Sequence, residues 1–279
     1  MRLSGISNCR PRPKGDDKPL LVQEGPGFHL GIAPEIITTG RHAAHFARAR
    51  YGDWLDADRS RFDSQFKRDY FTIAVGGGNT VKFEYRALLK YHAYDINWLE
   101  HVRFFFLEES CNEKNRESSR DALVSTFLAP LANALITRHG TLEITQKLGL
   151  GPHSSNEEIV RRLEQVMTFP IDMGGVEAAI ARGDRERALQ RAKQEARRYQ
   201  GVIRERLGPA MSFHMIVSGI AKDGGIGAFA TYTPELKQKE PAAIVLEKSN
   251  GAVSVALNRG VLTSAECISL IISGSLKLK

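Results

Sequence analysis

The chain has 279 residues, of which 42% are hydrophobic and 25% are charged, and its formal net charge is +7. This length and composition are typical of a protein with one sizeable core. No apolar run approaches the roughly 18 residues of a membrane-spanning helix, and no apolar signal segment follows the basic N-terminus. Three scattered cysteines, Cys9, Cys111 and Cys267, make no disulfide framework. We therefore expect a cytoplasmic protein that has no membrane partner.

The N-terminal segment differs in composition from the rest of the chain. Residues 1–25 are rich in proline, glycine and basic side chains, which predicts a flexible basic tail. We expect a single domain over residues 26–279. Its first helix is predicted near residues 40–57, where His42 and His45 share one face. Two histidines without a third ligand do not indicate a metal site, and we predict none.

The first well-marked unit is a strand, a glycine turn and a helix start in succession. The run Phe71–Val75 is largely apolar and predicts a buried strand, and Gly76, Gly77 and Gly78 then end it. Such a turn points backbone N–H groups outward, with the positive end of a helix dipole behind them. The local sequence fits an anion site and a turn that merely closes the unit equally well. It matches no complete nucleotide-binding motif.

The second unit is an apolar strand that ends in carboxylates. The run Val102–Leu107 predicts the strand, and Glu108 and Glu109 follow it directly. Open α/β sheets bind ligands at the carboxyl ends of their parallel strands. Either glutamate could act as a base, or both could begin a solvated loop. Helices are predicted over much of residues 118–207, including a capping-box start at Ser154–Glu157.

A densely charged run over residues 182–207 accounts for much of the basic charge. Its apolar residues recur every three or four positions: Leu189, Ala192, Ala196, Tyr199, Ile203 and Leu207. This spacing predicts an amphipathic helix with a solvated outer face, and it favours that interpretation over a nucleic-acid patch. No nucleic-acid-binding signature accompanies the run.

The third unit pairs a strand with a glycine-rich loop. Residues 212–218 predict the strand, and the loop 219–225 carries Asp223. Further strands are predicted near residues 242–246, 252–257 and 267–272. Strands that alternate with helices predict an α/β fold with a doubly wound, mostly parallel sheet flanked by helices. Strand ends that carry glycine or carboxylate predict one ligand crevice at an edge of this sheet, and His214 would lie at the opposite end of its strand.

In this order, the units resemble the 6-phosphogluconolactonase and glucosamine-6-phosphate isomerase (deaminase) superfamily. Residues 75–81 match its glycine loop, and residues 108–111 match its Asp-Glu-Arg-Cys segment. Residues 219–225 and 233–236 match its third motif and the Thr-Pro-x-Leu that follows. Residues 273–277 are similar to its Thr-Gly-x-x-Lys. The resemblance runs from about residue 35 to residue 279.

The resemblance implies which residues form the site. The phosphate would be held by Gly77, Gly78, Asn79 and Thr80, with a charge-assisted contact from Lys277. Glu108 and Asp223 would face the sugar carbon that reacts. The resemblance places the protein in carbohydrate metabolism. No sequence feature indicates a nicotinamide, a flavin or a metal, so we expect no cofactor.

The chain departs from the family pattern at three positions. Gly225 stands where the family has a histidine, which is understood to activate water in lactonases and to assist ring opening in deaminases. Loss of a general base typically lowers a rate by about 10²–10⁴-fold. Ser110 replaces the arginine after Asp-Glu, and a phosphate-binding arginine of the family aligns near Ser254.

The sequence is consistent with three functions. The first is a divergent enzyme, a lactonase-like hydrolase or an aldose–ketose isomerase or deaminase. The second is a protein that binds a sugar phosphate without turnover, as a sensor or partner subunit. The third is a scaffold whose basic tail and helix contact nucleic acid. The sequence favours the first and disfavours the third, and it leaves both the sugar and the possibility of a homo-oligomer open.

Overall fold

The structure is a computed structural model that describes residues 21–25, 28–32, 36–56, 70–92, 97–111, 116–220, 226, 241–248 and 251–271. For residues 21–38, 79, 91–98 and 116–117 within these ranges, only the backbone is described. Two short antiparallel strands, β1 (Leu21–Gly25) and β2 (Phe28–Ile32), precede the first helix. Residues 1–20 of the expected tail lie outside the described residues.

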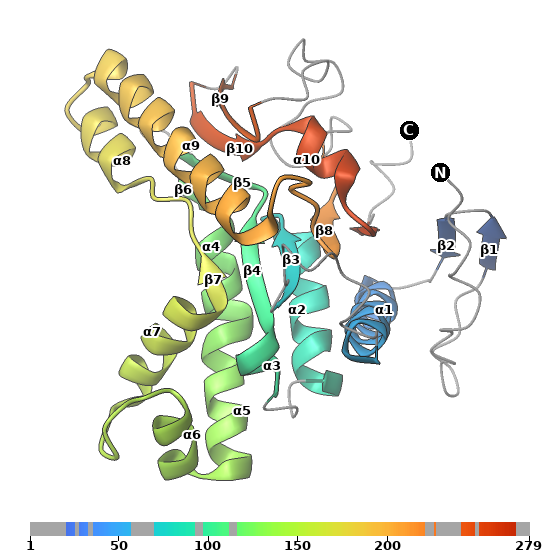
Figure 1. Ribbon diagram of the computed structural model, residues 1–279. Helices are drawn as coiled ribbons and strands as arrows, with labels where there is room; N and C mark the ends of the chain where they lie inside the picture. The colour runs from blue at the N-terminus through green and yellow to red at the C-terminus, as the bar shows by residue number, and fades with distance from the viewer. Residues whose placement is uncertain are drawn as a thin grey trace.

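The central layer is a parallel sheet in the order β11-β8-β3-β4-β7 (Figure 1). Its strands are β3 (Phe71–Val75), β4 (Val102–Phe106), β7 (Thr168–Phe169), β8 (Met215–Gly219) and β11 (Ile268–Ile271). Every neighbouring pair is parallel. All residues of β3 and β4 are buried, because helices cover both faces of the sheet. The predicted doubly wound α/β fold is confirmed.

A second, antiparallel sheet has the order β6-β5-β10-β9. Its strands are β5 (Glu108–Cys111), β6 (Arg116–Ser118), β9 (Ala243–Glu247) and β10 (Val253–Leu257). Leu107 alone separates β5 from the end of β4. Glu108 and Glu109 therefore begin a paired strand, and the alternative that they begin a solvated loop was wrong. The strands expected near residues 242–257 exist, but they belong to this sheet and not to the parallel one.

The helices account for most of the remaining described chain. They are α1 (Ile36–Asp56), α2 (Asn79–His92), α3 (Asn97–His101), α4 (Ser119–Leu123), a π-helical segment (Val124–Leu128), α5 (Ala129–His139), α6 (Thr141–Lys147), α7 (Asn156–Met167), α8 (Gly174–Ile180), α9 (Arg185–Leu207) and α10 (Arg259–Ser264). None of these described helices is long and apolar enough to cross a bilayer.

The capping box at the start of α7 lies one residue later than the sequence predicted. The Ser155 hydroxyl accepts a hydrogen bond from the backbone N–H of Glu158 at 3.2 Å, and the Glu158 carboxylate accepts the N–H of Ser155 at 2.8 Å. Ser154 and Glu157 have the same spacing. Ser155, however, has the extended backbone that a helix N-cap requires, so this pair forms the box.

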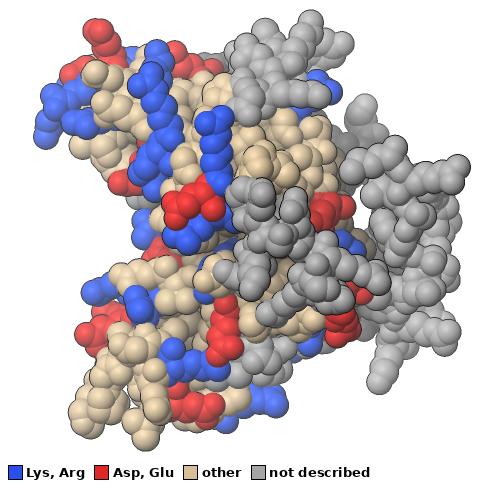
Figure 2. Space-filling model, in the orientation of Figure 1, with Lys and Arg blue, Asp and Glu red and all other residues tan. Residues whose placement is uncertain are grey.

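The charged run forms α9, as predicted. Asp184 caps the helix, and one face is buried along its length: Ala188, Ala192, Glu195, Ala196, Tyr199, Ile203 and Leu207. In Figure 2, basic side chains gather in the upper part of the view around α8 and α9, with acidic side chains among them. Opposite charges are thus interspersed on the outer face, as expected of a solvated amphipathic helix.

Candidate functional site

Three strands of the parallel sheet end side by side at one edge. β3 ends at Val75, β4 at Phe106 and β8 at Gly219. The ladder continues one residue further, because Gly76 N donates to Val217 O at 2.8 Å and Leu107 N donates to Val75 O at 2.9 Å. The glycine loop, the Glu108 strand and the segment after β8 therefore start as neighbours. This is the edge at which open α/β sheets bind ligands.

The glycine loop is tightly enclosed. A Cβ atom at Gly76 would lie 3.1 Å from Ser218 Oγ, and one at Gly77 would lie 2.7 Å from Ser119 Oγ. Gly78 has a φ of +92°, in the region that side chains rarely adopt. Two of the glycines thus permit close approach and the third permits the turn. The loop leads into α2, a helix of 14 residues, so the helix N-terminus lies directly behind it.

The first turn of α2 lies against the end of β8. Thr80 is half-buried, and its Cβ would lie 3.4 Å from a Cβ atom built at Gly219. The Tyr85 hydroxyl, one turn further along, donates to Gly76 O at 3.5 Å. Burial raises the pKa of Tyr85 well above its ordinary value, so this hydroxyl remains a donor. Helix α2 therefore holds the glycine loop in place through this hydrogen bond to Gly76.

Glu108 is the centre of a polar cluster. Its carboxylate forms an ion pair with Lys248 and accepts a hydrogen bond from Ser254 Oγ at 3.2 Å. The Glu108 side chain is 13% exposed. Its backbone oxygen accepts a hydrogen bond from Ser119 Oγ at 2.8 Å. Ser119 therefore contacts Glu108 and closely approaches Gly77, which joins the glycine loop to the carboxylate strand.

Glu109 has a different role, because successive side chains of a strand point to opposite faces. It is buried, and its carboxylate accepts the backbone N–H of Arg120 at 2.6 Å, in the first turn of α4. The Arg120 guanidinium is turned to Glu164 on α7. The local sequence could not distinguish the two glutamates. The structure assigns Glu109 to a helix N-terminus and leaves Glu108 in the cluster.

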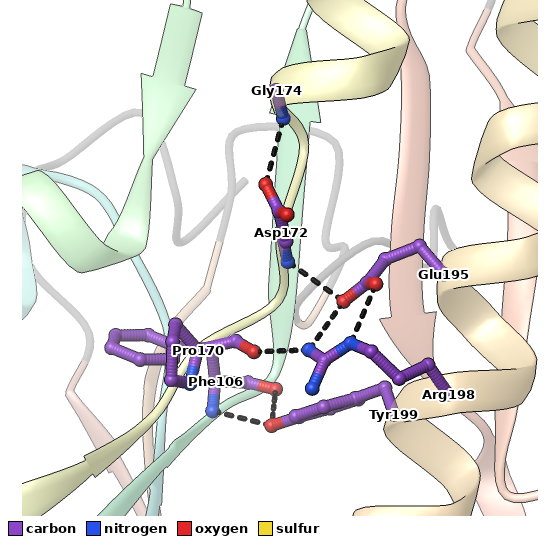
Figure 3. A network of polar contacts seen from close by, with 7 residues as sticks. All are labelled: Phe106, Pro170, Asp172, Gly174, Glu195, Arg198 and Tyr199. Atoms are coloured by element: carbon purple, nitrogen blue, oxygen red, sulfur yellow. Dashed lines mark hydrogen bonds and ion pairs between the residues drawn. The ribbon is translucent and has the colours of Figure 1, made fainter. Parts of the chain in front are cut away.

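A network on α9 supports the end of β4 (Figure 3). Arg198 donates to both carboxylate oxygens of Glu195 and to Pro170 O. Glu195 also accepts the backbone N–H of Asp172 at 2.7 Å. The hydroxyl of Tyr199, one residue from Arg198, contacts the backbone of Phe106. These contacts fix α9 against the segment that follows β7 and against the last residue of β4.

Several predicted site residues lie outside the described part of the chain. These are Asp223, Gly225 and Lys277. An antiparallel bridge between Ile220 and Ile226 brackets the segment that carries the first two. For Asn79, the backbone begins α2, but the side chain is not described.

His214 is buried at the start of β8, at the opposite end of the strand from the glycine loop, as predicted. Its Nδ1 atom lies 3.0 Å from the backbone nitrogen of Thr72 and 2.9 Å from the Thr72 hydroxyl. The N–H of Thr72 donates to the ring, so this histidine joins two strand starts. Among the residues with described side chains, no three His, Cys, Asp or Glu residues are grouped to hold a metal ion.

Sequence reasoning missed Lys248, Ser119 and Ser218. None of them belongs to a motif. Lys248 and Ser218 reach the site through pairing between distant strands, whereas Ser119 reaches it through the short β5–β6 hairpin that precedes α4. The sequence did contain one indication for Lys248. It directly follows an apolar strand, and because side chains alternate between the two faces of a strand, its position indicates the face on which its side chain lies. The position of that face relative to Glu108 depends on β9 pairing with β10 and β10 with β5.

The chain matches the family described as glucosamine-6-phosphate isomerases/6-phosphogluconolactonase over residues 57–279. Among solved structures, it is similar to the 6-phosphogluconolactonase from Trypanosoma cruzi, with a TM-score of 0.59, 18% identity, and coverage of 87% of this chain and 79% of that chain. The enzyme from Leishmania guyanensis gives a TM-score of 0.57 at 16% identity, with 86% and 80% covered.

A third similar structure is the 6-phosphogluconolactonase from Thermotoga maritima, with a TM-score of 0.51 and 12% identity over 86% of this chain and 82% of that chain. No curated protein matches the chain. At these identities the solved structures show the fold, and the family match covers most of the sequence. The chain belongs to the glucosamine-6-phosphate isomerase/6-phosphogluconolactonase family.

Proposed function

We propose that this protein binds a phosphorylated sugar at the edge of the parallel sheet, with the phosphate on the glycine loop and the sugar facing Glu108. The observation that carries the proposal is the link through Ser119, which joins Gly77 to the backbone of Glu108. The glycine turn and the start of the strand that carries Glu108 are thus held together. Family membership supports the same ligand class.

The phosphate would lie against the N-terminus of α2. Gly77, Gly78, Asn79 and Thr80 present their backbone N–H groups there, and the helix dipole adds partial positive charge. Lys277 would add a charge-assisted contact. A phosphate can approach this backbone closely only if Gly77 has no side chain. The packing of Gly77 against Ser119 imposes the same requirement.

The chemistry would use Glu108 and Asp223 at the first carbons of the sugar. An aldose–ketose proton transfer needs one placed base and an acid partner, whereas lactone hydrolysis needs an activated water. In the alignment that the family resemblance implies, Gly225 stands at the position of the family histidine, so proton transfer would fit these residues better than hydrolysis. Glu108 is oriented for such a role by its contacts with Lys248 and Ser254.

Binding without turnover is the second candidate. The observation that favours it is the occupation of one Glu108 oxygen by both Lys248 and Ser254. Taking up a proton on the other oxygen would neutralise the carboxylate and so weaken its ion pair with Lys248. A sensor or partner subunit would need the carboxylate only as a hydrogen-bond acceptor for sugar hydroxyls.

The test combines ligand binding with turnover. Thermal unfolding is measured with 6-phosphogluconate, glucosamine 6-phosphate, fructose 6-phosphate, glucose 6-phosphate, inorganic phosphate and the unphosphorylated sugars. We expect one phosphosugar, but not its unphosphorylated counterpart, to raise the melting temperature, because a ligand that binds only the folded state stabilises it. No shift at millimolar ligand would overturn the proposal.

Turnover then separates the two candidates. Lactone hydrolysis and aldose–ketose interconversion are assayed on wild type, Glu108→Gln and Asp223→Asn. Loss of about 10²-fold or more in either variant supports the enzyme, since a general base typically contributes that much. Binding with no turnover in wild type supports the second candidate. Turnover that is unchanged in both variants would contradict the site assignment.

A further inference from the structure

One face of the antiparallel sheet carries polar residues beside the proposed site, together with the apolar Leu246 and Ala256. Ser254 lies opposite Ser110 in the β5–β10 pair, and Glu108 is its diagonal neighbour on the same face. The backbone N–H of Lys248 donates to Ala252 O at 2.9 Å, which continues the β9–β10 ladder and places Lys248 on this face too. We call Glu108, Ser110, Ser254 and Lys248 the polar face.

This face is largely shielded from solvent. Ser254 is fully buried and Ser110 is 6% exposed. The side chain of Lys248 is 27% exposed. On the other face of β10, Val253 and Val255 are buried in the main core. A covered ion pair with serine hydroxyls offers little net stability over well-packed apolar side chains. Stability alone therefore does not account for these residues.

The polar face adjoins the glycine loop. Ser119 Oγ donates to the backbone oxygen of Glu108 and lies 2.7 Å from the Cβ position of Gly77. A phosphosugar whose phosphate occupies the loop would therefore extend toward Glu108. A phosphate ester is an anion, and a lone carboxylate beside it would repel it. Lys248 offsets that charge, so the site can accept an anionic ligand next to Glu108.

We propose that Lys248 recognises the oxygen atoms on carbon one of the bound phosphosugar, the end remote from the phosphate. This inference rests on the proposed function, because it requires the phosphate to lie on the glycine loop. An ammonium group has three donors, and among the described residues Lys248 pairs with Glu108. The ligand class is a phosphosugar with an electron-rich oxygen at carbon one: a carboxylate, a lactone carbonyl or an open-chain carbonyl.

The contact of Lys248 with Glu108 decides which end of the ligand it meets. In the proposed site Glu108 would face the reacting carbon, and the loop would bind the phosphate with its own backbone donors. Lys248 would then donate to an oxygen of carbon one while Glu108 accepts from a neighbouring hydroxyl. Lys248 and Glu108 would thus bind the groups at and next to carbon one, the carbon at which lactones, aldoses and aldonates differ.

The test compares two ligands that differ at carbon one. 6-Phosphogluconate has a carboxylate there and sorbitol 6-phosphate has a hydroxyl, while both carry the same phosphate. Affinities are measured by isothermal titration calorimetry for wild type, Lys248→Met and Lys248→Arg. We expect Lys248→Met to weaken 6-phosphogluconate binding by about 10- to 100-fold, as for loss of a charge-assisted hydrogen bond, and sorbitol 6-phosphate binding by less than about threefold. Lys248→Arg should retain most of the affinity.

Lys147→Met is the matched control. Lys147 also pairs with a glutamate, Glu100, at 2.6 Å, and its side chain is 28% exposed. It lies at the end of α6, far from β9 and β10 in Figure 1. The variant loses the same charge and should bind both ligands as wild type does.

Each outcome has a definite meaning. Equal weakening of both ligands by Lys248→Met would place Lys248 at the phosphate and overturn the inference, as would unchanged affinity for both. If wild type binds neither ligand, the proposed function fails, and the inference fails with it. If Lys248→Met does not fold, the Glu108→Gln/Lys248→Met variant removes both charges. It should then lose the preference for 6-phosphogluconate over sorbitol 6-phosphate, and a retained preference would overturn the inference.

Discussion

The hydroxyl of Tyr199 satisfies both backbone groups of Phe106. Its oxygen accepts the Phe106 N–H at 2.8 Å, and its hydrogen is donated to the Phe106 carbonyl at 3.0 Å. Strand β7 pairs with β4 only at Phe104 and Phe105. At Phe106 the Tyr199 phenol therefore makes the backbone hydrogen bonds that a further residue of β7 would otherwise make. The chain can therefore leave the parallel sheet after Phe106 and enter β5 with its backbone paired.

Tyr199→Phe should lower the free energy of unfolding by about 1–3 kcal/mol, because two buried backbone groups lose their partner. Burial raises the pKa of Tyr199, so the effect should persist across neutral pH. Urea denaturation measures it. Lys193→Ala, an exposed change on the same helix, should stay within about 0.5 kcal/mol of wild type. Equal stability of Tyr199→Phe and wild type would show that the phenol is dispensable.

Gly77→Ala should weaken phosphosugar binding about tenfold or more, since its Cβ would lie 2.7 Å from Ser119 Oγ and the loop would have to move. Adding Ser119→Ala removes that oxygen and should recover part of the lost binding. The control is Gly201→Ala on α9, where a Cβ meets no described atom within 4 Å. It should leave binding unchanged and stabilise by about 0.5–1 kcal/mol. Titration calorimetry that finds normal binding in Gly77→Ala would argue against the loop as the phosphate site.

Glu84→Gln should remove a dependence of stability on pH. Glu84 is fully buried on α2, no described residue hydrogen-bonds its carboxyl oxygens, and burial raises its pKa to about 8. Between pH 4.5 and 8 the folded chain holds a proton that the unfolded chain releases. The stability contributed by this group is therefore complete below pH 4.5 and is lost as pH rises to about 8, by about 1.4 kcal/mol per pH unit.

Urea denaturation at several pH values between 5 and 9 checks this expectation. The wild type should lose stability up to about pH 8 and then level off with respect to this group. Glu84→Gln should be more stable than wild type at pH 8, with the difference shrinking toward pH 5. Parallel profiles for the two proteins would mean that Glu84 does not carry the proton.

Ser155→Ala should destabilise the protein by about 1 kcal/mol, because the N-terminus of α7 loses its side-chain cap. Ser154→Ala, at the preceding position, should cost much less. The two neighbouring serines thus form a matched pair for thermal or urea denaturation. A larger loss of stability in Ser154→Ala than in Ser155→Ala would instead indicate that Ser154 and Glu157 form the capping box, as predicted from the sequence.

Local sequence determined the elements that depend on period and turn chemistry. The apolar run Phe71–Val75 became β3 with the predicted bounds, and the spacing of Ala192, Ala196 and Tyr199 produced the buried face of α9. The glycines after β3 marked the loop, because only glycine tolerates both close approach and a positive φ. These signals are local, since burial periodicity and backbone conformation are properties of a few adjacent residues.

Only the tertiary structure decided which of these segments meet. The local sequence did not distinguish Glu108 from Glu109, and only the family resemblance selected Glu108. In the structure, strand alternation turns Glu108 toward Lys248 and Glu109 toward the start of α4. Lys248 lies 140 positions along the chain from Glu108, and no spacing rule links them. Its place follows from the pairing of β9 with β10 and of β10 with β5. Such pairing depends on how the whole core packs, because the backbone hydrogen bonds that register two strands are the same for every sequence.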